Sequence, residues 1–370
     1  SSLPADRKKY YLDNIALIIP RAVRRMEQIR KKNGGGLFFW MDAEGTPFAF
    51  DTQSRRIPVS MDPAFSTSSD EFHVKALMAC AAFLKDDAMA RSAREYFARF
   101  VSDIRSDHVR SDQQPFDPKN PVGHVEGRHS HGVRMITLGG LAVFARFNKG
   151  PEYVETGIEF IRHILDNYVN IGGRFPGLEE LDFVEFIDPK GKPYLQNGDI
   201  MCDPGHALEF VGLAFKFLNV IRGRKTLTRD QKAFIAQCDE LLPAILLHTF
   251  KLGYNERVGG ICKAMSLNRR KPFNSDMPWW NLPETLRAAM FSYAAAPQAD
   301  TRRACLEVIR KSSNAFLGNF INPDVHLMAY QTLDENGKPV KVIPATPDLD
   351  PGYHTGLSVI DFLRQLEAAK

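Results

Sequence analysis

Cysteine is scarce in this chain of 370 residues, and long apolar runs are missing from it. The five cysteines (Cys80, Cys202, Cys238, Cys262 and Cys305) form no CxxC pair. An odd, sparse set of this kind favours reduced thiols over a disulfide framework. The apolar runs fall far short of a bilayer-spanning length, and no charged–apolar–small signal pattern is present. We therefore expect a cytoplasmic protein with no membrane partner.

The chain also lacks a large excess of charge of either sign. Its 48 Lys and Arg nearly balance its 44 Asp and Glu, and the formal net charge is +4. No segment has the density of basic and aromatic residues that a nucleic-acid groove needs, so no nucleic-acid partner is expected. No Walker A motif is present, and the glycine triplet at 34–36 precedes a hairpin pattern where a dinucleotide fingerprint would open a helix. We expect no cofactor.

Helical periodicity, by contrast, is present along most of the chain, with apolar residues at three- and four-residue spacing. The predicted helices cover approximately 7–32, 70–85, 87–105, 131–148, 151–168, 205–222, 228–250, 280–296, 299–317 and 353–368. Links of a few polar residues join several of them in pairs, which favours antiparallel neighbours.

One hairpin pattern, Asp-x-x-Gly-x-Pro, recurs between the helices and begins at Asp42, Asp188 and Asp334. Its glycine supplies the positive φ that a tight hairpin loop demands. Four predicted helices separate the first pattern from the second, and four more separate the second from the third. This order favours an all-α fold, an (α/α)6 barrel with short β-hairpins on one face, in a single catalytic domain over 1–370. An irregular all-α domain would give the same periodicity.

The segments that carry chemistry begin with PGHALE at 204–209, which opens a long apolar helix. His206 and Glu209 are three residues apart, so a helix places them one turn apart on one face. Downstream, PWWNLPE at 278–284 contains two of the three tryptophans. The C–H faces of a sugar stack on indole while its hydroxyls need polar partners, so Trp279, Trp280 and Glu284 are candidates for substrate binding.

Two further histidines stand where helices are predicted to start. His131 lies in GRHSHGVR at 127–134, and His354 lies in PGYHTG at 351–356. A metal site built from His124, His129 and His131 fits no common zinc spacing, so we expect no metal here.

These segments, in this order, resemble the N-acylglucosamine 2-epimerase family of sugar 2-epimerases and aldose–ketose isomerases. The resemblance implies an isomerase of carbohydrate metabolism that needs no cofactor and forms a possible homodimer. It implies His206 and His354 as the catalytic acid/base pair, with Glu209 orienting His206. The residues implied to hold the sugar are His131, Trp279, Trp280, Glu284 and Arg128.

Two departures from the family pattern bear on the reaction. Arg134 stands where the family has a glutamate, and Leu77, with Lys75 nearby, stands where the family has an arginine. Barrels of this kind also host glycoside hydrolases and lyases, which use paired carboxylates. The candidates for such a pair are Glu179, Glu180, Asp182, Glu185 and Glu284. A non-catalytic carbohydrate-binding role also stays open, and Arg128, Arg134 and Lys75 would suit an anionic sugar.

Overall fold

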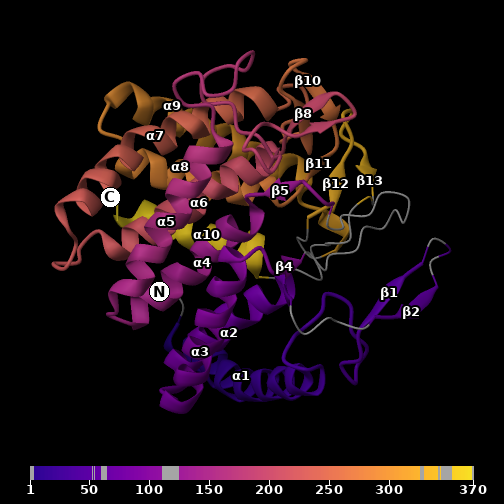
Figure 1. Cartoon of the computed structure of the whole chain (residues 1–370), viewed down its shortest axis with the longest axis vertical. Coiled ribbons are helices and arrows are strands. Elements are labelled where there is room, and N and C mark those ends of the chain that lie inside the picture. Colours follow the sequence, from indigo (N-terminus) through magenta and orange to yellow (C-terminus); the bar gives the residue numbers. More distant parts are fainter. Residues whose placement is uncertain are drawn as a thin grey trace. The chain divides into compact units, whose positions relative to one another are not determined.

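The computed structural model describes residues 4–51, 53, 55–59, 65–110, 125–325, 329–340, 342 and 352–368. These residues form ten α helices and short strands (Figure 1). All ten helices agree with the helices predicted from periodicity. Contacts divide the chain into two compact units, Ser1–His124 and Val125–Lys370. Each unit is described by itself, and the single domain expected over 1–370 stays a prediction.

The first unit is built on a helical hairpin. Its elements are α1 (Ala5–Lys32), β1 (Phe48–Phe50), β2 (Arg56–Pro58), β3 (Ser66–Thr67), α2 (Ser68–Leu84), α3 (Asp87–Arg105) and β4 (Val109–Arg110). A capping box begins α2, in which Thr67 and Asp70 satisfy each other's backbone N–H groups. Lys85 ends α2 in the left-handed conformation, and the Asp86 side chain caps α3 directly afterwards. The tight turn therefore packs α3 back along α2.

The second unit has two kinds of helix. The helices are α4 (Gly132–Phe147), α5 (Pro151–Tyr168), α6 (Pro204–Ile221), α7 (Arg229–Gly253), α8 (Asn281–Ala295), α9 (Ala299–Ala315) and α10 (Ser358–Ala368). Helix α4 packs on α6, α6 on α8, and α8 on α10, while α5, α7 and α9 pack against this row. Fourteen residues of α6 are buried but only four of α9. Helices buried all round form the inner row, and those with a single apolar stripe cover it.

Short strands of the second unit lead into the inner helices. They are β5 (His129–Ser130), β6 (Phe186–Ile187), β7 (Leu195–Gln196), β8 (Asp199–Cys202), β9 (Ala264–Ser266), β10 (Lys271–Asn274), β11 (Met277–Pro278), β12 (Thr332–Leu333) and β13 (Pro339–Val340). One antiparallel sheet has the order β10-β9-β8-β7 and another has the order β11-β12-β13. Because β5, β8 and β11 directly precede α4, α6 and α8, the strands gather where these helices begin (Figure 1).

The three predicted hairpin turns are present. The N–H of the glycine bonds to the Asp C=O at Asp42, Asp188 and Asp334, and the three glycines have φ between 75° and 82°. The Asp carboxylate also accepts backbone N–H groups inside the turn, as at Asp188, where Lys190 and Lys192 donate at 2.8 and 2.9 Å. The pattern recurs because both its Asp and its Gly have a fixed task in one turn.

Helix α7 is long and apolar enough to cross a membrane by length and composition, with a mean hydropathy of 1.2 over its most apolar window. Half of that window is buried inside the protein, as in a core helix. One helix of this kind among the described residues is weak evidence for a membrane span.

Candidate active site

His206 stands in the first turn of α6, and the local sequence fixes that turn. The Asp203 carboxylate caps the helix by accepting the backbone N–H groups of Gly205 at 3.0 Å and His206 at 3.3 Å. Pro204 occupies the first helical position, where its missing N–H costs nothing. The PGH sequence thus begins the helix at the strand side of the unit and presents the imidazole there.

Gly205 is required by the close approach of α6 to the start of α8. A Cβ at this position would collide with the Asn281 amide and lie 2.9 Å from the Trp280 ring. We expect Gly205→Ala to lower the free energy of unfolding by about 1–3 kcal/mol through overpacking. Gly223→Ala is the matched control, because no atom lies within 4 Å of its Cβ. Urea denaturation of both variants measures the difference, and equal stability would contradict the tight contact.

Two carboxylates surround the His206 imidazole. Its Nδ1 lies 3.0 Å from Glu185 Oε1 and 3.4 Å from Asp203 Oδ2. Lys263 Nζ pairs with the same Asp203 oxygen at 2.5 Å. Burial lowers the pKa of His206, but the charges of Asp203 and Glu185 outweigh it and raise that pKa to about 9. His206 is therefore an imidazolium at neutral pH.

Glu185 joins His206 to a second histidine. Its Oε2 lies 3.3 Å from His131 Nε2, while Oε1 faces His206. Burial raises the pKa of Glu185, but the charges of His206 and His131 outweigh it and hold the pKa well below its usual range. The His131 side chain is fully buried and packs edge-on against Phe183 at 4.8 Å. His131, expected to bind the sugar, thus lies behind Glu185 and contributes to the site through it.

That Glu209 orients His206 stays a prediction, and the structure gives His206 two other carboxylate neighbours. His206 takes its carboxylate partners from Glu185 and Asp203, while Glu209 Oε1 accepts a hydrogen bond from the Tyr353 hydroxyl at 3.4 Å. The His206 ring at the helix start turns toward the strands, and Glu209, one turn on, faces the C-terminal segment. Helical spacing alone cannot reveal this, because the true partner comes from β6 and its flanking residues.

His354 lies in a π-helical turn, Tyr353–Leu357, that leads into α10. Its Nδ1 lies 3.1 Å from Glu284 Oε1. The same oxygen accepts a hydrogen bond from Ser358 Oγ at 2.9 Å, and Arg287 pairs with the other oxygen. The Glu284 side chain is completely buried. It therefore contacts His354 from the protein interior and presents no surface to a ligand.

Two buried carboxyls beneath His354 have opposite ionisation tendencies. Burial raises the pKa of Glu284, but the Arg287 charge and the hydrogen bonds from His354 and Ser358 outweigh it and lower that pKa. Burial and the nearby Glu284 charge raise the pKa of Glu209. The pKa values of the two neighbouring carboxyls are therefore displaced in opposite directions.

The Trp280 ring contacts both of the partly exposed histidines. Its ring lies 5.5 Å from the His206 ring and 5.0 Å from the His354 ring, at interplanar angles of 29° and 31°. The two imidazoles keep 30% and 20% of their side-chain surface exposed. Lys263 Nζ adds a cation 5.4 Å from the same indole. Sequence positions 206, 280 and 354 thus meet at one place.

The two tryptophans differ in position. Trp279 is completely buried, and its indole N–H donates to Thr355 Oγ1 at 3.2 Å. The structure packs Trp279 beneath the π-helical turn. That Trp279 binds the substrate stays a prediction.

The arginines of the GRHSHGVR segment point in different directions. Arg128 stacks over the Phe186 ring at 4.3 Å, beside Glu185 in the sequence. Arg134 lies 5.8 Å from the Phe160 ring of α5, on the side of the outer helices. Lys75 and Leu77 belong to the other unit, where Leu77 is buried in α2. His124, a histidine considered for a metal, lies outside the described residues.

Two groups of described residues have ligand atoms within 4.8 Å of one another, close enough to hold a metal ion. One is Glu179, Asp182 and His248, and the other is Glu209, Glu284 and His354. In each group a guanidinium already pairs with the carboxylates. Arg270 pairs with Glu179 and Asp182, and Arg287 pairs with Glu284. A divalent ion would have to compete with a guanidinium in either place.

Comparisons with known proteins identify the family and the fold of this chain. The profile of the family described as N-acylglucosamine 2-epimerase (GlcNAc 2-epimerase) matches residues 59–356. The fold is similar to that of a D-mannose isomerase, with a TM-score of 0.61 at 14% identity over 96% of this chain and 84% of the other. It is also similar to the cellobiose 2-epimerase of Bacillus thermoamylovorans B4167, with a TM-score of 0.58 at 13% identity over 86% and 78%. None of the curated proteins matches the sequence. The predicted all-α, (α/α)6 barrel fold is confirmed.

Proposed function

Because this chain belongs to the N-acylglucosamine 2-epimerase family, we propose that it moves a proton at C2 of a ring-opened reducing sugar between His354 and His206. Membership makes the protein a carbohydrate epimerase or isomerase. The proposal adds the residues and the direction of proton transfer.

One observation carries the proposal: two exposed imidazoles share the Trp280 ring, and each is held at Nδ1 by a carboxylate. The carboxylates orient the rings, so proton transfer falls to Nε2 of each. The Trp280 ring is itself buried, at 7% exposed, and packs against both imidazoles, so it fixes their positions relative to each other. In the proposed complex the reacting sugar carbon lies between the two Nε2 atoms, with the donor on one side and the acceptor on the other.

The charge state of each histidine sets its role. His206 is an imidazolium with two carboxylates near it, so we assign it as the proton donor. The carboxylate of His354 is already matched by Arg287, so we assign His354 as the base. His354 Nε2 takes the C2 proton, the electron pair moves into the carbonyl to give an enediolate, and His206 returns a proton to C2. No electron acceptor is needed, because the oxidation state is unchanged over the cycle.

The pH profile of kcat/KM tests the state of His206. Because the pKa of His206 is raised to about 9, we expect kcat/KM to fall above about pH 9 as the donor deprotonates. The raised pKa of His206 also stabilises the folded state. This stabilisation is fully present below pH 6.5 and is lost as the pH rises through 9. Initial rates between pH 6 and 10.5 measure this limb.

Glu185→Gln tests whether the charge of Glu185 acts on His206, because it removes that charge and keeps the size of the side chain. Removing one of the two charges that raise the pKa of His206 should move the alkaline limb down by about 1–3 pH units. Glu240→Gln, on an exposed part of α7, makes the same chemical change away from the site and should leave the limb in place. An unmoved limb in Glu185→Gln would contradict the acid role of His206.

The substrate and the outcome at C2 are tested together by proton NMR in D2O. The panel contains D-mannose, D-glucose, D-fructose, N-acetylmannosamine and cellobiose. Deuterium at C2 with a new epimer supports epimerisation, and deuterium at C1 with a ketose supports isomerisation. No exchange in any reducing sugar would overturn the proposal. It would favour a lyase or glycoside hydrolase, or a carbohydrate-binding protein without activity.

A further inference from the structure

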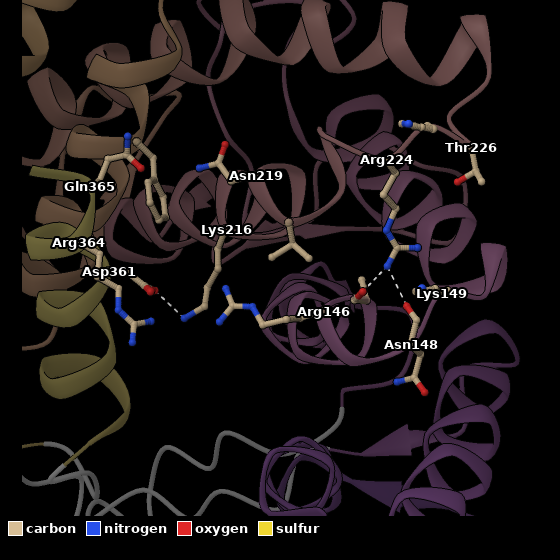
Figure 2. Close-up of a pocket in the computed structure, with 14 residues that line it drawn as sticks. Arg146, Asn148, Lys149, Lys216, Asn219, Arg224, Thr226, Asp361, Arg364 and Gln365 are labelled. Carbon is tan, nitrogen blue, oxygen red and sulfur yellow. Dashed lines mark hydrogen bonds and ion pairs between the residues drawn. The ribbon is translucent and has the colours of Figure 1, made fainter. Parts of the chain in front are cut away.

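A cavity of about 710 Å³ lies within the second unit, away from the histidines (Figure 2). Residues near the ends of α4 and α6 line it together with residues of α8 and α10. Six of its lining residues are cationic, namely Arg146, Lys149, Lys216, Arg224, Lys225 and Arg364. Asp361 is the single acidic residue in its lining. The lining therefore has a formal charge of +5, against +4 for the whole chain.

The cavity is distinct from the candidate active site because it lies at the other end of the inner helices. His206 stands in the first turn of α6, and Lys216 follows ten residues later, about 15 Å along the axis. On α4, His131 precedes the first turn, while Arg146 is in the last. A ligand in this cavity would therefore not touch the exposed imidazoles.

Some of the cations already have partners, and others do not. Lys216 Nζ pairs with Asp361 at 2.5 Å, and Arg224 donates to the backbone oxygens of Ala145 and Asn148 at the end of α4. Cations at helix C-termini are favourable because of the helix dipole, which accounts for Arg224. Among the described residues, no carboxylate pairs with the four exposed cations, Arg146, Lys149, Lys225 and Arg364.

Three of the cationic head groups face one space. Figure 2 shows the head groups of Arg146, Lys216 and Arg364 turned toward the same space, with Asp361 beside Lys216. We propose that this cavity binds a small anion with two or more negative charges, either a phosphate compound or a polycarboxylate. Planar guanidinium groups bind both kinds of oxygen bidentately, and the volume suits a small molecule. This inference goes beyond the proposed sugar chemistry and does not depend on it.

Isothermal titration calorimetry with pyrophosphate and with citrate, at fixed ionic strength, tests the site. We expect saturable one-to-one binding of at least one probe, and the tighter of the two names the phosphate or the polycarboxylate class. The double variant Arg146→Gln/Lys149→Gln should weaken that binding at least tenfold. The double variant Lys232→Gln/Lys251→Gln removes two exposed charges from α7 and should change it less than twofold.

Two results would overturn the proposal: no saturable binding of either probe, or equal weakening in the two double variants, since equal loss indicates unspecific charge attraction. Arg364→Gln is the second test if the first variant does not fold, because Arg364 is an exposed residue on another helix. It should weaken binding at least threefold, and unchanged affinity would also count against the site. Calorimetric binding needs no turnover, so its failure is independent of the proposed sugar reaction.

Discussion

His354→Asn is expected to lower turnover at least a thousandfold while leaving the helical circular dichroism unchanged. General acid–base groups typically contribute about 10²–10⁴-fold, and His354 is assigned to the step that breaks the C2–H bond. His354 is partly exposed, and its Nδ1 lies 3.1 Å from Glu284 Oε1, a contact that the amide of an asparagine can keep. Deuterium exchange and product formation, followed by NMR in D2O, should both be lost.

His206→Asn separates the two roles. Without its donor, the enzyme should fail to form the epimer, while His354 still exchanges the C2 hydrogen of the starting sugar with solvent deuterium. His108→Asn, an exposed histidine of the first unit, serves as the control and should keep full activity. Epimer formation at the normal rate in His206→Asn would refute its assignment as donor. Deuterium exchange at C2 that persists in His354→Asn would refute the assignment of His354 as the base.

The second large effect concerns stability. Arg287 is 2% exposed and pairs with the fully buried Glu284, whose other oxygen is held by His354 and Ser358. Arg287→Met would leave an uncompensated carboxylate in the core, next to Glu209. We expect a loss of about 3–5 kcal/mol in the free energy of unfolding, since breaking a buried pair from one side has this cost. Denaturant unfolding at pH 7.5 measures it.

The double variant Arg287→Met/Glu284→Gln provides the internal control. Removing both charges should recover part of the lost stability, because the penalty comes from the unpaired charge. Arg310→Met, which breaks an exposed pair with Glu307, should leave the unfolding midpoint unchanged. If Arg287→Met were as stable as Arg310→Met, the buried pair would not be a structural element.

Local patterns predicted a large part of this protein. The ten helices follow from periodicity, and the three hairpin turns follow from an Asp and a Gly with fixed tasks in one turn. His206, Trp280 and His354 were identified because each stands at a helix start marked by proline or glycine. These helices lie in one row and begin on the same side of it. The three motifs therefore lie close together although they are far apart in the sequence.

The contacts that periodicity does not predict have a common physical cause. Glu185 was considered only as a hydrolase carboxylate, because it follows no helix and its neighbours Phe183 and Phe186 mark a strand. Its two histidine partners depend on the pairing of β6 with β5, which periodicity does not encode. Trp279 and Trp280 are equivalent in the sequence pattern, and both rings are buried, at 0% and 7% exposed. Packing distinguishes them, because Trp279 donates to Thr355 while Trp280 lies against the rings of His206 and His354.

The segment from His354 to Asp361 has a consequence for how this protein becomes and stays active. Within eight residues it supplies one exposed histidine, a hydroxyl bonded to Glu284, and a carboxylate that pairs with Lys216. These three contacts are made by side chains, so the backbone hydrogen bonds within α6 and α8 do not depend on them. Enzyme activity should then report the attachment of α10 and should disappear before the rest of the protein melts. A protease that cuts just before Tyr353 would switch off the chemistry and leave most of the fold intact.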